Sequence, residues 1–463
     1  MRVLLLNTNR LKVPQPVIPL GLCQVAEATQ TTGHDVRLLD LCFDRDPIEA
    51  ARLAVRDFDP DTVGISVRNL DNCDSQTQDT YLQDVRELVT AIRRDTPAHV
   101  VLGGPAVSIA PEPVLDYVGA DSAVVGEGEK SFPELLEHLD RAQPVWRADK
   151  SGLSAPSSLP VKMLRNLPLR RYAAHGTPAP IQTRRGCSLG CVYCTYPAIE
   201  GTTYRLKPAG AVAEEILEAQ SLGVLRSAEF VDSTFNYPVD HAFRVCEELE
   251  RLRVRTPLHT TGINPLGAST ELFRLMERAG FEGISISLES ASDEVLQGLG
   301  KGYTSHDVAE TVRAARMTSM ARLWVFMFGG PNETERTVNE TLDFIRRYLD
   351  GRDLVLLTCG IRIYPGTKLE EIARREGVLT GAEDLLQPVF YFSPGIGRER
   401  LLEILSGAGL CSGTTILARD MSWPALTLLN RLLSVLRLKQ PYWRYARPVM
   451  TVRHAIGGVK TLK

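Results

Sequence analysis

The sequence RRGCSLGCVYCTY occupies residues 184–196 and places Cys187, Cys191 and Cys194 at CxxxCxxC spacing. Thiolates are soft ligands that favour iron–sulfur clusters and zinc. Because most 4Fe–4S clusters take four cysteines, a loop that offers three would leave one iron free for another ligand. The alternatives are a zinc knuckle, for which no fourth Cys or His stands nearby at zinc spacing, and reduced thiols in a core. We predict that the three cysteines are metal ligands.

Length and composition indicate a soluble globular protein of two or three domains, because 463 residues exceed one ordinary domain. A net charge of −3 gives no bias toward nucleic acid, so we expect no nucleic-acid partner. The odd total of nine cysteines, six of them scattered, favours a reducing cytoplasm over a disulfide framework. No apolar run approaches the roughly 20 residues of a membrane span. The first residues are typical of a strand rather than a signal peptide.

Residues 1–141 alternate between short apolar runs and segments with helical periodicity. The runs are Val3–Leu6, Val36–Leu41, Thr62–Val67, Val100–Leu102 and Ser122–Val125. Continuously apolar strands that alternate with helices predict a parallel sheet buried on both faces, as in a doubly wound, Rossmann-like α/β domain.

Polar residues and glycines follow these strands, at the edge where such sheets bind ligands. A glycine there lets a bulky ligand approach the backbone, although each short glycine motif alone is equally explained by turn chemistry. The candidate ligand-binding residues are Asn7, Arg68, Asn69, Gly103, Gly104, Gly126 and Gly128.

The rest of the chain divides into three parts. Prolines and serines in residues 142–178 predict a long interdomain linker. Residues 179–378 resume the strand–helix alternation for six units, which predicts a partial (β/α)6 barrel with its chemistry at the carboxyl ends of the strands. Regular alternation then ends, and we expect residues 379–463 to form a small, mainly helical region with a basic tail.

That tail, residues 431–463, contains eight Lys and Arg and no Asp or Glu. We expect a solvated tail that packs on the open side of the barrel. The alternatives are a wall for an anionic substrate, a partner surface and a peripheral membrane contact. The aromatic residues Trp423, Tyr442, Trp443 and Tyr445 suit each alternative.

The cysteine motif, with Tyr193 just before its last cysteine, resembles the radical S-adenosylmethionine superfamily. The resemblance implies a 4Fe–4S cluster whose free iron binds S-adenosylmethionine and cleaves it to a 5′-deoxyadenosyl radical. It also implies nucleotide contacts at polar groups and glycines that follow the later barrel strands. The matching residues are Asp232, Asn236, Glu289, Gly329, Gly330 and Arg362.

The GGP, GEGE and PLG segments of residues 1–141 resemble the cobalamin-binding domain that precedes many radical S-adenosylmethionine cores. The segment lacks the DxHxxG motif whose histidine binds cobalt in classical cobalamin proteins. If cobalamin binds, we therefore expect cobalt without a histidine ligand from the protein, with Arg68 as the candidate residue near its lower face.

The resemblance implies a class B radical S-adenosylmethionine methyltransferase of natural-product (antibiotic-type) biosynthesis, which methylates an unactivated carbon through methylcobalamin. Its partners would be a small-molecule substrate and an electron donor such as flavodoxin or ferredoxin. The first alternative is a cobalamin-independent radical dehydratase or deoxygenase that acts on an aminoglycoside-type sugar and keeps a vestigial cobalamin domain. The second alternative is a non-catalytic cobalamin or cluster sensor.

Overall fold

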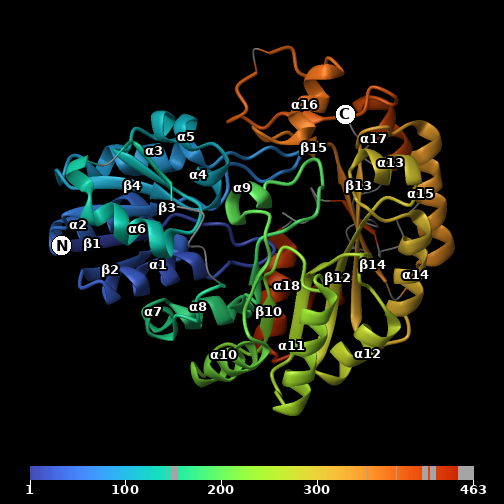
Figure 1. Ribbon diagram of the computed structural model, residues 1–463, viewed down its shortest axis with the longest axis horizontal. Helices are drawn as coiled ribbons and strands as arrows, with labels where there is room; N and C mark the ends of the chain where they lie inside the picture. Colours follow the sequence, from blue (N-terminus) through green and yellow to red (C-terminus); the bar gives the residue numbers. More distant parts are fainter. Residues whose placement is uncertain are drawn as a thin grey trace.

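The computed structural model describes residues 1–141, 143–147, 155–351, 353–381, 383–408, 415–417 and 424–446. Two parallel sheets with flanking helices form most of the structure. Figure 1 shows the N-terminal sheet, coloured blue to cyan, beside the larger sheet built from the green to orange part of the chain.

The N-terminal sheet has the strand order β2-β1-β3-β4-β5-β6, and every pair of neighbours is parallel. Its strands are β1 (Arg2–Asn7), β2 (Asp35–Asp40), β3 (Thr62–Ser66), β4 (His99–Gly103), β5 (Ser122–Val125) and β6 (Val145–Arg147). Its helices are α1 (Leu20–Thr31), α2 (Pro47–Phe58), α3 (Leu82–Ile92), α4 (Pro105–Ile109), α5 (Pro111–Val118) and α6 (Gly128–Glu137). The order confirms the predicted doubly wound domain.

Both faces of this sheet are buried, as the continuous apolar runs predict. Within β1, Val3 and Leu5 belong to the core that includes α1 and α6, whereas Leu4 and Leu6 belong to the core that includes α2 and α3. Successive side chains of a strand point to opposite faces, so a strand with helices on both sides must be apolar throughout.

The second sheet has the parallel order β17-β14-β13-β12-β11-β10-β7. Its strands are β7 (Ala179–Ile181), β10 (Ala228–Phe230), β11 (Leu258–Ile263), β12 (Phe281–Glu289), β13 (Ala321–Phe328), β14 (Leu354–Cys359) and β17 (Thr415–Leu417). The helices between them are α10 (Ala209–Ser221), α11 (Val239–Arg251), α12 (Thr270–Arg278), α13 (Asp293–Gly298), α14 (Ser305–Ala315) and α15 (Glu335–Tyr348). Consecutive strands lie side by side, which confirms the predicted partial barrel.

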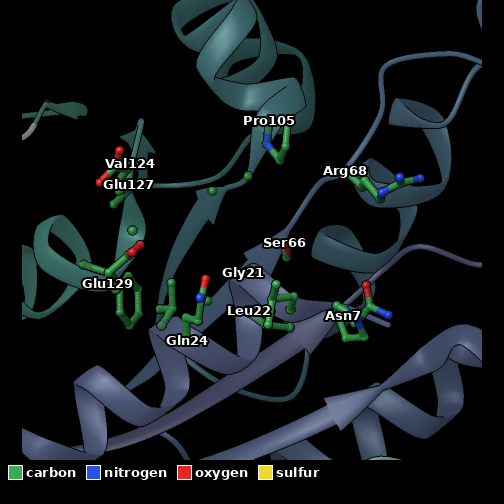
Figure 2. A pocket seen from close by; sticks show the side chains of 18 of the residues that line it. Asn7, Gly21, Leu22, Gln24, Ser66, Arg68, Pro105, Val124, Glu127 and Glu129 are labelled. Atoms are coloured by element: carbon green, nitrogen blue, oxygen red, sulfur yellow. The ribbon is translucent and has the colours of Figure 1, made fainter. Parts of the chain in front are cut away.

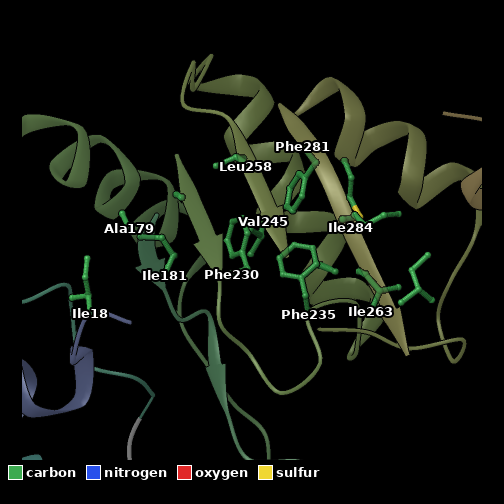
Figure 3. Close-up of a cluster of buried hydrophobic side chains, with 14 of the residues drawn as sticks. Ile18, Ala179, Ile181, Phe230, Phe235, Val245, Leu258, Ile263, Phe281 and Ile284 are labelled. Carbon is green, nitrogen blue, oxygen red and sulfur yellow. The ribbon is translucent and has the colours of Figure 1, made fainter. Parts of the chain in front are cut away.

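Aromatic side chains hold the first barrel strands against their helices. Phe230 of β10 packs at 4.7 Å from Phe235 and at 5.2 Å from Phe281 of β12, measured between ring centroids. Figure 3 shows these rings together with Val245 of α11 on the same side of the sheet. The opposite face of the strands is therefore left for the interior of the barrel.

The last of the predicted barrel units is interrupted after β14. Gly360 has a φ of 76° and separates β14 from β15 (Ile361–Arg362), which pairs with β16 (Phe390–Tyr391) in a separate two-stranded antiparallel sheet. A Cβ at Gly360 would lie 2.5 Å from the ring of Phe392, so this turn requires glycine. The C-terminal region is also not only helical, because β17 adds a seventh strand to the sheet.

Residues 440–446 of the C-terminal region cover the amino ends of the barrel strands. Gln440 donates to the carbonyl of Gly176 before β7 at 3.0 Å, and Arg444 donates to the carbonyl of Glu282 in β12 at 2.6 Å. Tyr442, Trp443 and Tyr445 therefore lie at the end of the barrel opposite to the predicted chemistry. Trp423 and residues 447–463 lie outside the described residues.

The predicted linker contains α7 (Val161–Arg165) and α8 (Leu169–Ala174), and its Leu164 and Tyr172 lie in the core shared with α1. The N-terminal sheet extends past residue 141, because β6 pairs with β5. The domain division at residues 141, 178 and 378 stays a prediction. Within the described ranges, no helix combines the length and the apolar character needed to cross a membrane.

Candidate active site between the two sheets

The three predicted cluster cysteines lie on one loop near the carboxyl end of β7. The loop runs from β8 (Arg184–Arg185) to α9 (Tyr196–Glu200), and β8 pairs with β9 (Arg205–Leu206). Gly186 enters the loop with a φ of 82°, where a Cβ would lie 2.0 Å from the carbonyl oxygen of Thr203. The fold therefore requires a glycine directly before Cys187.

The cysteine loop is fixed at its centre by Val192. The Val192 amide donates to the carbonyl of Leu299 at 3.1 Å, and its carbonyl accepts from the amide of Leu369 at 2.8 Å. Cys187 is buried, whereas Cys191 and Cys194 are partly accessible. Burial raises the pKa of Cys191 and raises that of Cys194 to about 11, so these thiols are protonated until a metal replaces the proton.

The donor set fits an iron–sulfur cluster better than a single metal ion. Among the residues that the structure describes, no three His, Cys, Asp or Glu side chains are grouped to hold one ion. Each cysteine of a cubane binds a different iron, so its sulfurs need not converge on one point. Three thiols on one rigid loop meet that requirement.

Glu289 lies beside the cysteine loop in a buried hydrogen-bonded group. It is the last residue of β12, and its Oε1 accepts from the hydroxyl of Tyr193 at 2.9 Å and from Nζ of Lys301 at 3.0 Å. Lys301 also donates to the Tyr193 hydroxyl at 2.7 Å. Burial lowers the pKa of the Lys301 ammonium, but the nearby Glu289 carboxylate raises it by more. The pKa therefore lies above the usual lysine value, and the ammonium stays charged.

Sequence reasoning did not identify Lys301. It stands in the segment GLGKGYT, which has no ligand spacing of its own. Its contacts depend on the turn that brings residue 301 back to the end of β12, so no local pattern indicates them.

Asp232 and Asn236 follow β10, and both hold neighbouring loops. The Asp232 carboxylate accepts from the amide and hydroxyl of Thr183, at 2.8 and 2.9 Å, and from the amide of Arg184 at 3.1 Å. Asn236 donates to the carbonyl of Asn264 at 2.7 Å and accepts from its amide at 2.9 Å. Asp232 therefore positions the segment that leads into the cysteine loop.

The remaining nucleotide candidates follow β13 and β14. Gly329 adopts a φ of 96°, and its amide donates to the Glu333 carboxylate. Burial raises the pKa of Glu333 to about 8, although hydrogen bonds from the amides of Gly329 and Gly330 oppose the shift. Arg362 donates from Nε to Asp71 of the N-terminal domain at 2.7 Å, so its guanidinium holds the two domains together.

A cavity of about 340 Å³ opens at the carboxyl edge of the N-terminal sheet and reaches the first barrel strands. Figure 2 shows Asn7 and Arg68 on one side of it and Gln24, Glu127 and Glu129 on the other. Six of the predicted cobalamin-binding residues line it: Asn7, Arg68, Gly103, Gly104, Gly126 and Gly128.

The cavity fits a bulky, largely apolar ligand. A Cβ at Gly103 would meet no atom within 4 Å, so the missing side chain leaves open space there. Asn69 lies instead at a second cavity of about 420 Å³, between α2 and α3, which Arg68 also lines. None of the described residues that line either cavity is a histidine.

Charged contacts connect this cavity to the cysteine loop. Arg185, two residues before Cys187, pairs with Glu127 at 2.9 Å and also with Glu129. Arg205 of β9 pairs with Glu127 as well. Only the glycines of the GEGE segment were predicted to have a role, as ligand-binding residues. Its glutamates also join the N-terminal domain to the cysteine loop.

Comparison with known proteins assigns a separate family to each of the two domains. Residues 7–136 match the B12 binding domain, and residues 181–345 match the Radical SAM superfamily. An uncharacterized methyltransferase, PH0819 of Pyrococcus horikoshii, is 27% identical over 384 residues, which are 78% of this chain and 79% of the relative. The tryptophan 2-C-methyltransferase of Streptomyces laurentii is 25% identical over 421 residues, 74% of this chain and 69% of the relative.

A solved structure has the same fold over nearly the whole chain. The radical S-adenosylmethionine methyltransferase TsrM from Kitasatospora setae, with tryptophan and a S-adenosylmethionine analogue bound, superposes with a TM-score of 0.82 at 23% identity and covers 98% of this chain and 99% of TsrM. A second TsrM structure, with a TM-score of 0.79, holds cobalamin and a [4Fe-4S] cluster. The chain therefore belongs to the radical S-adenosylmethionine enzymes that carry an N-terminal cobalamin-binding domain.

Proposed function

We propose that this enzyme methylates a carbon atom of a natural-product intermediate, with S-adenosylmethionine as the methyl source and cobalamin as the carrier. The observation that supports this most is the cavity at the carboxyl edge of the N-terminal sheet, whose wall continues onto Pro180 and Val231 of the barrel. A ligand in that cavity would face the same space as the cysteine loop. The methyltransferases among the relatives do not favour the dehydratase alternative.

The chain's own residues would hold and orient the reactants. When bound, the cluster and cobalamin would supply the electron for cleavage of S-adenosylmethionine and the carrier for its methyl group. Cys187, Cys191 and Cys194 would hold the cluster. Glu289 would accept from the ribose hydroxyls of S-adenosylmethionine, with its carboxylate oriented by the Tyr193 hydroxyl and the Lys301 ammonium.

The other nucleotide candidates would act mainly as positioning residues. Asp232 uses both carboxylate oxygens within the protein, so we propose that it keeps the cysteine loop in place and contacts the methionine end only secondarily. Gly329 and Gly330 would leave room for the adenine. Arg362 would act on this site by docking the two domains.

Arg68 remains our candidate for the residue near the lower face of cobalt. It lines both cavities, and its charge acts on Glu229 in β10. Burial raises the pKa of Glu229 to about 7, and Arg68 opposes that shift. Arg68 therefore borders both the cavity and the barrel strand that carries Glu229.

The test uses a substitution that fills the cavity and leaves the cluster ligands unchanged. Gly103→Leu adds a side chain where a Cβ meets no atom within 4 Å, and Gly210→Leu is the matched control on α10, with equal space. After anaerobic reconstitution with iron, sulfide and hydroxocobalamin, we expect Gly103→Leu to keep its iron and lose its cobalamin, and Gly210→Leu to keep both.

Two outcomes would contradict the proposal. Equal cobalamin binding by the Gly103 variant would mean that the cavity is not the cobalamin site. Failure of the unmodified protein to bind cobalamin, with substrate-dependent release of 5′-deoxyadenosine, would support the dehydratase instead. Transfer of an isotope-labelled methyl group from S-adenosylmethionine, with S-adenosylhomocysteine as product, is the result expected for a methyltransferase.

We also infer that the enzyme works in a reducing compartment, namely the cytoplasm, with a small electron carrier such as flavodoxin or ferredoxin. Eight cysteines among the described residues are free, which suits such a compartment. Reduction of the cluster requires an external electron. Reconstituted protein should therefore cleave S-adenosylmethionine when reduced flavodoxin is the sole reductant.

A further inference from the structure

The helix α18 (Pro424–Val435) presents an apolar face to solvent. Eleven large hydrophobic side chains are exposed in the described part of the chain, and five of them fall between residues 428 and 438. Leu428, Leu432, Val435 and Leu436 are 68%, 53%, 74% and 58% exposed. Their spacing of four, seven and eight residues places them on one side of a helix.

The opposite side of α18 is already packed against the protein. Leu426 and Leu433 are buried, and Asn430 donates to the carbonyl of Pro14 at 2.7 Å. Ser434 donates to the carbonyl of Ala173 in α8 at 2.6 Å, so α18 packs against α8. A helix that is apolar on both sides needs a second apolar environment for its outer face.

The surroundings of this face are basic. Arg431 and Arg437 are exposed on or directly after the helix, and residues 424–440 include no Asp or Glu, whereas the charge of Lys439 is paired with Glu282 at 2.7 Å. Exposed Arg170 and Arg171 of α8 add to them in a segment, residues 165–176, that also lacks acidic residues.

Three cations gather beside the helix. Lys12 and Arg171 lie over the ring of Phe43, at 5.6 and 4.7 Å from its centroid, and Arg431 stands on the helix itself. In the sequence, residues 431–463 hold eight Lys and Arg and no Asp or Glu. The apolar stripe is thus bordered by positive charge.

We propose that the outer face of α18, with the arginines beside it, docks the enzyme on an anionic membrane surface. An interfacial helix buries its apolar side among the lipid headgroups while basic residues bind anionic lipids. The contact is peripheral, because the twelve residues of α18 are fewer than the roughly 20 of a membrane span.

The positive charge around α18 disfavours other molecules that could cover its outer face. A symmetric dimer through α18 would bring the same cations together across its axis, and like charges that meet at an interface oppose association. An anionic bilayer matches both the charge and the apolar stripe.

The test measures co-sedimentation of the full-length, reconstituted enzyme with vesicles. Phosphatidylcholine vesicles that contain phosphatidylglycerol should bind the enzyme, vesicles of phosphatidylcholine alone should bind it far less, and high salt should release it. Arg431→Gln with Arg437→Gln should weaken binding about 25-fold, or about fivefold for each cation. Leu432→Ser with Leu436→Ser should weaken it more than tenfold.

Matched controls distinguish binding through this surface from nonspecific binding to vesicles. Leu217→Ser with Met317→Ser removes apolar residues that are 41% and 55% exposed on or directly after other helices, and Arg251→Gln with Arg278→Gln removes the same charge from α11 and α12. Both pairs should bind vesicles like the unmodified enzyme. Cleavage of S-adenosylmethionine should stay unchanged in every variant, which shows that each folds.

The proposal is wrong if the unmodified enzyme does not bind anionic vesicles, or if the variants of α18 bind as well as the controls. It is also wrong if light scattering shows dimers that Leu432→Ser with Leu436→Ser dissociates, because a second copy would then cover the face. Binding to an acidic protein in place of vesicles would likewise overturn it.

Discussion

Loss of the ion pair between Arg362 and Asp71 should destabilise the protein strongly. Its atoms Nε and Oδ2 lie 2.7 Å apart, and the two side chains are only 3% and 0% exposed. Arg362 also donates from Nη2 to the carbonyl of Leu385 at 2.8 Å, and Asp71 accepts from the amide of Cys73 at 2.9 Å. The pair joins the loop after β3 to β15, across the domain interface.

Asp71→Asn keeps the shape of this side chain and removes its charge. The Arg362 guanidinium cannot lose its proton, so it would stay buried without a counter-charge. Breaking a buried pair in this way costs about 3–5 kcal/mol. The control is Glu340→Gln, whose partner Arg336 is 58% exposed, while Glu340 is 39% exposed. Surface pairs of this kind contribute about 0–1 kcal/mol.

The assay is urea denaturation of reconstituted protein under anaerobic conditions, followed by tryptophan fluorescence. Asp71→Asn should lower the free energy of unfolding by several kcal/mol more than Glu340→Gln. Adding Arg362→Met to Asp71→Asn should recover part of the loss, because the uncompensated charge is then gone. Equal losses for Asp71→Asn and Glu340→Gln, or a further loss in the double variant, would refute this reasoning.

Replacing Cys187, Cys191 and Cys194 together with alanine should remove bound iron and charge-transfer absorbance; iron that stays near four per chain would contradict the ligand assignment. Glu289→Gln should weaken S-adenosylmethionine binding roughly tenfold or more in equilibrium dialysis, since a charge-assisted hydrogen bond contributes about 1.5–3 kcal/mol, and the cluster spectrum should not change. Folded protein binds the Glu333 proton more tightly than the unfolded chain does, so its contribution to stability is complete below the usual glutamate pKa and is lost as pH rises through about 8. In urea titrations Glu333→Gln should flatten that pH dependence, and an unchanged slope would exclude Glu333 as its source. Reduced, cobalamin-loaded enzyme should give a paramagnetic spectrum without nitrogen superhyperfine splitting, whereas such splitting would show a nitrogen ligand on cobalt.

Local patterns in the sequence were sufficient for the architecture. The apolar runs of residues 1–141 are buried strands, because a strand covered on both faces must be apolar at every position. Strand-end positions were also predictable, because parallel strands bring their carboxyl ends to one edge. Asn7, Gly103 and Gly126 lie at the carboxyl ends of three different strands, and they line the same cavity for that reason.

Tertiary structure alone decided the partners of the charged groups. Arg362 was predicted to contact nucleotide, but its ionic partner Asp71 is 291 residues away along the chain. Lys301 gave no signal in the sequence, although it joins Glu289 to the cysteine loop. Periodicity and motif spacing report on neighbours along the chain, within one helix turn or one strand. The partner of a buried charge depends instead on how two separately formed sheets dock, because desolvation makes an unpaired charge costly only once the interface has closed.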